Sequence, residues 1–123
     1  MRVLIVDDSE VFVHRLASSL AEVTGLEIVG YANNVADAVK EIRKVEPDVV
    51  ILDIRIPGGS GIDVLAALKE DQFKPIVIVL SNYGFPQYRR KCLRSGARFF
   101  IDKSAEFHKV TEVLRSLMEA TAA

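Results

Sequence analysis

The sequence contains a single cysteine, Cys92, no tryptophan and no excess of charge of either sign. One cysteine cannot form a disulfide within the chain, so a hydrophobic core must hold the fold together. The formal net charge of -1 gives no general attraction to nucleic acid or to acidic membranes. No apolar run approaches the roughly 20 residues of a membrane span, and two aspartates follow the first apolar run too early for a signal peptide. We therefore expect a cytoplasmic protein without a membrane partner, whose specificity comes from a local site.

Half of the 123 residues are hydrophobic, which is enough to build one sizeable core. Five short apolar runs recur along the chain, and each is followed by a segment with helical periodicity. Runs such as residues 49–52 and 76–80 are apolar at every position, as is typical of parallel strands covered by helices on both sides. We predict one domain over residues 1–123, an α/β fold with a doubly wound, five-stranded parallel sheet between two helical layers. The predicted strands are residues 3–6, 28–32, 49–52, 76–80 and 98–101.

Residues that favour helix starts follow the predicted strands. Ser9 and Asn34 are good N-caps for the first two helices, and the glycine-rich segment 58–61 is a turn that leads into the third. Pro86 suits the first turn of the fourth helix. We expect Ser104 to cap the fifth helix, whose apolar residues recur at spacings of three and four.

Polar residues that can do chemistry come directly after four of the five predicted strands. Asp7 and Asp8 follow the first strand, Asp53 the third, Ser81 the fourth, and Lys103 lies shortly after the fifth. In a flavodoxin-like strand order of 2-1-3-4-5, the first and third strands flank the point where the order reverses, and ligands bind there. Three crowded carboxylates repel one another, and carboxylate oxygens suit Mg²⁺. The pattern therefore predicts a Mg²⁺ site beside Asp53.

Asp53 is the candidate nucleophile of that edge. A carboxylate can attack a phosphoryl group to form an aspartyl phosphate, and the transfer depends mostly on positioning and on neutralising the phosphoryl oxygens. Mg²⁺, the Lys103 ammonium and the Ser81 hydroxyl could each hold one oxygen. A single aspartate after a strand is usually a cap or a turn residue, so this interpretation rests on the coincidence of the groups at one edge.

These motifs resemble the receiver domain of bacterial two-component response regulators, and the resemblance covers essentially the whole chain. It implies a flavodoxin-like, chemotaxis-type receiver that consists of a single domain. It further implies that Asp53 accepts phosphate from a sensor histidine kinase or a histidine phosphotransfer protein. Such a domain is a signalling switch and not an enzyme, because it assists only its own phosphorylation and dephosphorylation. The motifs are residues 3–9, residues 53–57 with Gly61, residues 80–81 and residues 100–103.

The resemblance also assigns roles to individual residues. Asp7, Asp8 and Asp53 would bind Mg²⁺ together with the backbone carbonyl of Arg55. Ser81 and the aromatic Phe100 occupy the positions that rearrange when relatives are phosphorylated, although Phe100 fits equally well as a core residue.

The resemblance suggests that output passes through the face formed by the fourth helix, fifth strand and fifth helix. Because no DNA-binding or catalytic output module accompanies the receiver motifs, we expect a downstream protein partner and no direct nucleic-acid contact. A basic cluster on the fourth helix could dock an acidic partner, but such a run of charges usually forms a solvated polar face. The cluster is Arg89, Arg90, Lys91 and Arg94.

Four positions depart from the family's usual pattern or tune its chemistry. Ser104 stands where many relatives have a cis-proline after the lysine. Asn82 follows the switch hydroxyl, where relatives usually have a small residue, and we hypothesise that it alters phosphodonor entry or the path of hydrolytic water. Arg55 and Tyr83 occupy positions that tune the phosphoryl lifetime in relatives, in a direction that the residues do not determine.

Two other functions are compatible with a similar sheet. A Mg²⁺-dependent phosphohydrolase with an aspartyl-phosphate intermediate would resemble haloacid dehalogenases, but these usually carry a second aspartate where this chain has Arg55. A flavodoxin-like FMN binder needs a phosphate-cradling loop after the first strand, whereas Asp7 and Asp8 would repel the cofactor phosphate.

Overall fold

The computed structural model describes residues 1–82 and 85–122, and its main feature is a five-stranded parallel sheet. The strand order is β2-β1-β3-β6-β7, with every neighbouring pair parallel. This confirms the predicted doubly wound sheet, in which the order reverses between β1 and β3. The strands are β1 (Arg2–Val6), β2 (Glu27–Ala32), β3 (Val49–Leu52), β6 (Ile76–Ser81) and β7 (Phe99–Asp102).

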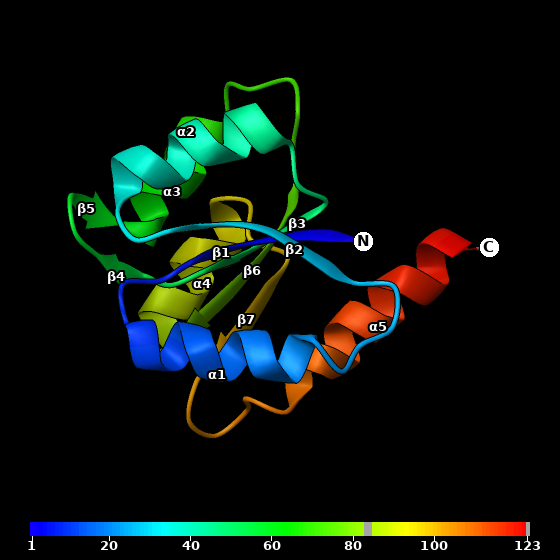
Figure 1. Cartoon of the computed structure of the whole chain (residues 1–123). Coiled ribbons are helices and arrows are strands. Elements are labelled where there is room, and N and C mark those ends of the chain that lie inside the picture. Colours follow the sequence, from blue (N-terminus) through cyan, green and yellow to red (C-terminus); the bar gives the residue numbers. More distant parts are fainter. Residues whose placement is uncertain (83–84, 123) are drawn as a thin grey trace.

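Helices cover both faces of the sheet, because successive strand residues point to opposite sides. Figure 1 shows α1 (Glu10–Leu20) and α5 (Lys109–Ala122) below the sheet, and α2 (Val35–Val45) and α3 (Gly61–Leu68) above it. Val3 and Ile5 of β1 pack with α1 and α5, whereas Leu4 and Val6 join the core under α2, α3 and α4 (Pro86–Arg94). Cys92 lies in this second core and is fully buried, as a small apolar residue would be.

Most of the predicted helix starts are confirmed by their caps. The Ser9 hydroxyl accepts a hydrogen bond from the backbone N–H of Phe12 at 3.3 Å, and the Asn34 side chain accepts one from Asp37 at 2.8 Å. Pro86 occupies the first turn of α4. The caps of α1 and α2 fix where the chain turns after β1 and β2, and thus which residues remain at that edge of the sheet.

The predicted start of the fifth helix is wrong, because α5 begins at Lys109 and Ser104 does not cap it. The Asp102 carboxylate instead accepts hydrogen bonds from the backbone N–H groups of Ser104 at 2.8 Å and Ala105 at 2.9 Å. The backbone N–H of Asp102 donates to the Glu106 carboxylate at 3.1 Å. These local bonds satisfy the backbone in a turn and delay the helix.

A short antiparallel hairpin that the sequence did not predict lies between β3 and α3. It consists of β4 (Arg55–Ile56) and β5 (Gly59–Ser60). Gly58 has φ of +87°, a left-handed conformation that favours glycine. The hairpin leads to Gly61, where an added Cβ atom would lie 2.3 Å from the carbonyl oxygen of Asp53. Glycine is therefore required for α3 to start directly beside the Asp53 backbone.

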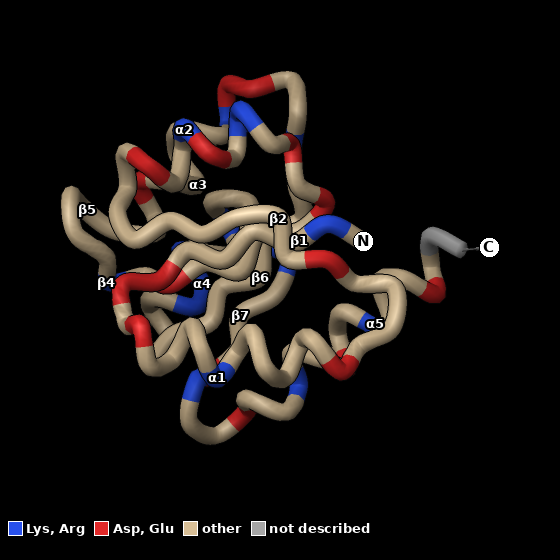
Figure 2. The backbone as a smooth tube through the Cα atoms, viewed as in Figure 1, with Lys and Arg blue, Asp and Glu red and all other residues tan. Residues whose placement is uncertain are grey.

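Charged side chains are unevenly placed around this framework. Figure 2 shows acidic residues where β1 passes into α1, next to the hairpin of β4 and β5. Within the described part of the chain, no helix has the length and apolar character that would let it cross a membrane.

Candidate functional site

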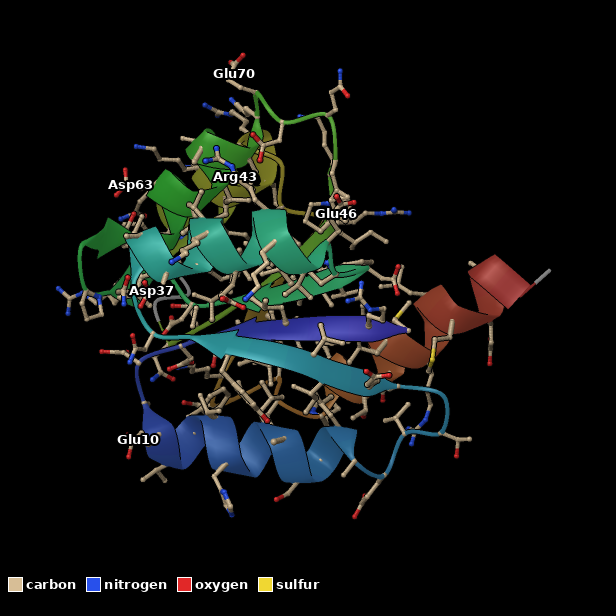
Figure 3. The ribbon with its side chains drawn as sticks, turned by 45° about the horizontal axis from the view of Figure 1, so that its top comes forward. Glu10, Asp37, Arg43, Glu46, Asp63 and Glu70 are labelled. Carbon is tan, nitrogen blue, oxygen red and sulfur yellow. The ribbon has the colours of Figure 1, made fainter. Side chains whose placement is uncertain are left out.

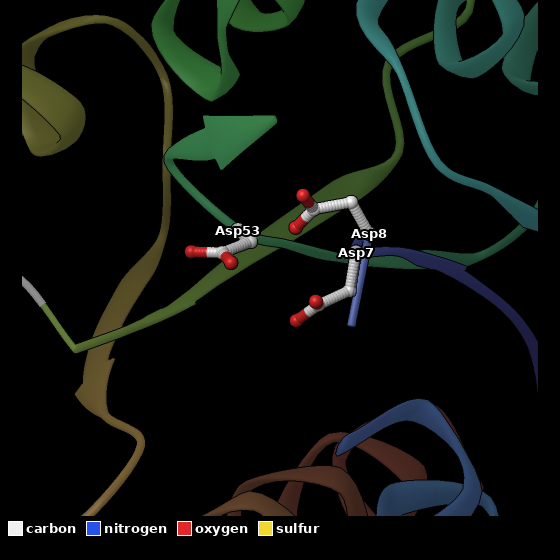
Figure 4. A group of neighbouring side chains, drawn as sticks. All are labelled: Asp7, Asp8 and Asp53. Atoms are coloured by element: carbon white, nitrogen blue, oxygen red, sulfur yellow. The ribbon is translucent and has the colours of Figure 1, made fainter. Parts of the chain in front are cut away.

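Three aspartates meet at the carboxyl edge of the sheet. Oxygen atoms of Asp7, Asp8 and Asp53 lie within 4.8 Å of one another, and Figure 4 shows Asp7 and Asp8 on one strand end and Asp53 on the neighbouring one. Asp7 and Asp53 are buried, with 6% and 7% of their surface exposed, whereas Asp8 is exposed. The structure thus brings together the carboxylates that the sequence predicted to meet.

The parallel register of β1 and β3 places these residues side by side. Val6 pairs with Leu52, so both strands end at the same level and the next residue of each is an aspartate. The backbone N–H of Asp53 donates to the Val6 carbonyl at 3.0 Å, and that of Asp7 donates to the Ala32 carbonyl at 3.0 Å. Hydrogen bonds to the neighbouring strands therefore fix the backbone of Asp7 and Asp53.

Both buried carboxylates are also held by local backbone donors. One oxygen of Asp7 accepts a hydrogen bond from the N–H of Ser9 at 2.9 Å, and one oxygen of Asp53 accepts one from Ile54 at 2.7 Å. Each carboxylate thus has a fixed orientation and a second oxygen for other contacts.

The second oxygen of each buried aspartate contacts Lys103. The Lys103 Nζ atom lies 2.7 Å from Oδ2 of Asp7 and 3.0 Å from Oδ2 of Asp53. Only 7% of the lysine surface is exposed. Burial by itself would lower the pKa of Lys103, but the hydrogen bonds to Asp7 and Asp53 outweigh that effect and raise it. The Lys103 ammonium thus lies between the two buried carboxylates, and both contacts favour its charged form.

Burial makes the charged form of Asp53 unfavourable in the folded protein. Its pKa is raised, mainly because burial disfavours the anion; the Lys103 contact opposes this shift, and the nearby charge of Asp7 adds to it. Among the described residues of the site, three carboxylates and one ammonium have, at their formal charges, an excess of two negative charges. An arrangement of hard oxygen donors with this charge fits a divalent cation such as Mg²⁺.

The predicted hydroxyl lies on the next strand. Ser81 ends β6 and is fully buried, and its backbone carbonyl accepts a hydrogen bond from the N–H of Lys103 at 3.0 Å. Ser81 and Lys103 therefore come from adjoining strand ends. Phe100 is 5% exposed and packs in the core under α2, α3 and α4, with the Arg89 guanidinium 5.8 Å from its ring centre. The switch roles of Ser81 and Phe100 stay predictions.

The remaining predicted positions lie around this centre. Arg55 starts β4 and has an exposed side chain, and its role as a carbonyl ligand stays a prediction. Asn82 is exposed, and its side-chain oxygen accepts a hydrogen bond from the Ser104 hydroxyl at 3.2 Å. Asn82 and Ser104, which both differ from the residues usual in the resembling family, thus contact each other. Tyr83 lies outside the described residues.

Sequence reasoning missed two features beside the site. The first is an acidic cleft of about 490 Å³ between α1 and the start of α2, and Figure 3 shows Glu10 and Asp37 on these two elements. Its position depends on the distance between two helices, which no sequence spacing reveals. The second is Phe12, whose ring centre lies 4.2 Å from the Lys103 Nζ atom. Phe12 is one of several apolar residues of α1, and helical spacing does not show which loop its ring contacts.

Comparison with known proteins gives consistent matches. A sequence model of the response regulator receiver domain matches residues 3–115. A Pseudomonas aeruginosa protein named as a transcriptional regulator is 43% identical over 103 residues, which cover 83% of this chain and 49% of that protein. The transcription regulator BvgA of Bordetella pertussis is 35% identical over 119 residues, 95% of this chain and 56% of that protein. The crystal structure of a DNA-binding response regulator of the LuxR family from Staphylococcus aureus matches with a TM-score of 0.85 at 25% identity, over 94% of this chain and 96% of that chain.

These matches contradict the predicted set of partners. The sequence led us to expect output to a protein partner without direct nucleic-acid contact, whereas the relatives are named as regulators of transcription and one as DNA-binding. The chain spans about half the length of the curated relatives it matches. The prediction was wrong because it treated the motifs within these 123 residues as informative about output, although they report only on the receiver.

Proposed function

This chain belongs to the response regulator receiver domain family, and from that premise we propose that Asp53 is its phosphoryl acceptor. The chain is a phosphorylatable signalling switch of a two-component system. This assignment rests on one observation. The buried carboxylate of Asp53 contacts the Lys103 ammonium and lies beside the carboxylates of Asp7 and Asp8. A sensor histidine kinase or a phosphotransfer protein would supply the phosphoryl group.

The geometry suggests how each side chain contributes to transfer. Ile54 holds one oxygen of Asp53, which leaves the other to attack phosphorus. An oxygen–phosphorus bond forms as the nitrogen–phosphorus bond of the phosphohistidine breaks, and the leaving imidazole takes up a proton. Lys103 is placed to move from the Asp53 oxygen to a phosphoryl oxygen and neutralise it, and the Ser81 hydroxyl can donate to another.

Asp7, Asp8 and Asp53, with the predicted carbonyl of Arg55, are the residues that would hold Mg²⁺. When bound, the ion supplies positive charge that screens the carboxylates and the phosphoryl oxygens. The three carboxylates would supply its ligands, and the Lys103 ammonium neutralises part of their charge. The cluster of three carboxylates beside a single ammonium supports the assignment of Mg²⁺ as the cofactor.

Mass spectrometry of the protein with a small phosphodonor tests the proposal. We expect the intact protein to gain one phosphoryl group only in the presence of Mg²⁺, and Asp53→Ala to gain none. Glu10→Gln is a matched control, because this exposed carboxylate lines the acidic cleft but is not one of the three clustered aspartates. Phosphorylation of Asp53→Ala, or phosphorylation without any divalent cation, would overturn the assignment. Rapid turnover of the donor would instead favour the phosphohydrolase alternative.

We propose that the switch regulates transcription, since the curated relatives are named for that activity. Residues 1–123 would form one receiver domain that acts in the cytoplasm and catalyses only its own phosphorylation and dephosphorylation. The stand-alone chemotaxis-type arrangement has less support, because the curated relatives named above are about twice as long as the region they share with this chain.

A further inference from the structure

The aromatic ring of Phe12 lies beside the active-site lysine. Its centre is 4.2 Å from the Lys103 Nζ atom, well within the range of a cation–π contact. Phe12 sits in the first turn of α1, where its backbone N–H donates to the Ser9 cap, so the ring is carried by a fixed piece of backbone. The Lys103 ammonium therefore has three neighbours that stabilise its charge, two carboxylates and one aromatic ring.

A second ring supports the first. Phe107 packs against Phe12 with its ring centre 5.7 Å away and an interplanar angle of 82°, which is an edge-to-face contact. The Arg15 guanidinium lies 4.2 Å from the centre of the Phe107 ring. Because Phe107 lies in the turn that follows Lys103, the two rings join the start of α1 to the loop that carries the lysine.

The ring differs from the two carboxylates in one chemical respect. A lysine has a flexible four-carbon chain, so the place of its ammonium depends on what surrounds it. Asp7 and Asp53 attract the ammonium, but the same carboxylates are the proposed metal ligands, and a divalent cation competes for their oxygens. An aromatic ring is no ligand for a hard cation of this kind, so its attraction for Lys103 does not depend on whether the metal is bound.

We propose that Phe12 is a positioning residue that keeps the Lys103 ammonium directed at the phosphoryl-acceptor edge when the carboxylates engage the metal. This inference rests on the proposed function of Lys103. The simpler alternative is that Phe12 only fills the core beneath α1 and α5, against which it also packs. The two roles differ in whether the effect of Phe12 depends on the lysine.

A spectroscopic test needs neither metal nor phosphodonor. Protons on the Lys103 side chain near the face of a ring are shifted upfield in the NMR spectrum, and Phe12→Leu should return them to ordinary lysine values. Phe12→Tyr keeps the ring and should keep the shift. Phe99→Leu is the matched control, since Phe99 is another half-buried aromatic residue packed against the same core. Unshifted Lys103 protons in the parent protein would overturn the proposal.

A double-mutant cycle tests the consequence for transfer. At saturating Mg²⁺ and phosphodonor, Phe12→Leu should slow phosphorylation by about two- to tenfold, as expected for loss of one partly buried cation–π contact. In a Lys103→Ala background the same substitution should leave the residual rate unchanged. An equal loss in both backgrounds would show that Phe12 is only a core residue. Failure of the parent protein to accept phosphate would count against the proposed function instead, and the NMR shift would still decide whether Phe12 holds Lys103.

Discussion

At the scale of single residues, the burial of Asp53 gives its charge a cost in the folded protein. Because burial raises its pKa, the folded protein favours the protonated form of Asp53 more than the unfolded chain does. The stabilisation that comes from the protonated form is therefore complete below the pKa of the unfolded chain, and it is lost as pH rises through the higher pKa of the folded state. Above that pH the charged form of Asp53 costs the folded protein stability.

Replacing this anion should therefore stabilise the protein when no divalent cation is present. We expect Asp53→Asn to raise the free energy of unfolding at neutral pH, because the neutral asparagine side chain has no charge for burial to disfavour. Lys103 keeps its Asp7 partner in this variant, and the asparagine carbonyl can still accept a hydrogen bond. Urea denaturation in EDTA at several pH values measures the effect. The gain should shrink toward acidic pH, and a destabilised variant at neutral pH would contradict this account.

The contact between Asn82 and Ser104 gives a second prediction at this scale. The Ser104 hydroxyl holds the Asn82 amide beside the strand ends that carry Ser81 and Lys103. If the amide restricts approach to Asp53, Asn82→Ala should speed both phosphorylation by a small donor and spontaneous dephosphorylation, by roughly two- to fivefold for one exposed hydrogen-bonded group.

Ser104→Ala should reproduce part of that change, and the double variant should exceed Asn82→Ala by little, because both substitutions remove the same contact. The rates can be followed by separating the phosphorylated and free forms over time. Unaltered rates in Asn82→Ala would rule out a role for this side chain in access.

At the scale of secondary structure elements, the start of α3 is tied to the backbone of the acceptor loop. The N–H of Gly61 donates to the Ile54 carbonyl at 2.7 Å, and there is no room for a Cβ atom beside the Asp53 carbonyl. We predict that Gly61→Ala moves either the helix or the loop. The free energy of unfolding should fall by about 1–3 kcal/mol, as is typical of overpacked sites, and phosphorylation of Asp53 should slow.

Gly30→Ala is a suitable control for this substitution. Its added Cβ atom would meet only flexible side chains, Leu4 at 3.3 Å and Glu41 at 3.7 Å, and its φ angle is ordinary. Thermal unfolding and the phosphorylation rate should both be much less affected than in Gly61→Ala. Equal effects of the two substitutions would show that the close approach at Gly61 has no special importance.

The elements also show how far the sequence could be interpreted. Apolar runs and caps predicted the sheet and four of the five helix starts, because these depend on local spacing. The start of α5 was mispredicted because Asp102 and Glu106 compete with Ser104 for the backbone groups of the turn. Asp53 and Lys103 could be placed together because parallel strands share one edge. The contact of Phe12 with Lys103 depends on helix packing against a loop, which residue spacing does not encode.

At the scale of the whole molecule, metal binding should be linked to stability. A ligand that binds only the folded state raises the free energy of unfolding with its concentration, by about 2.7 kcal/mol at one hundred times its dissociation constant. We therefore expect Mg²⁺ to raise the melting temperature of the parent protein progressively. Asp8→Asn should abolish most of this rise, since Asp8 belongs to the acidic cluster but has no ion pair with Lys103.

Calorimetric or fluorescence-dye melting curves measure the response, with sodium chloride at matched ionic strength as the control. The same rise in sodium chloride would indicate general screening of the acidic edge and not a specific site. The melting temperature therefore reports metal binding independently of phosphorylation.

The order in which the strands join has a consequence for when signalling can begin. Asp7 lies near the amino terminus and Lys103 near the other end of the chain, and they meet only because β7 completes the edge of the sheet beside β6. During synthesis, Asp7 leaves the ribosome well before Lys103. A nascent chain therefore cannot form this contact until β7 and Lys103 have been made, and we expect the acceptor edge to be complete only in the fully synthesised receiver.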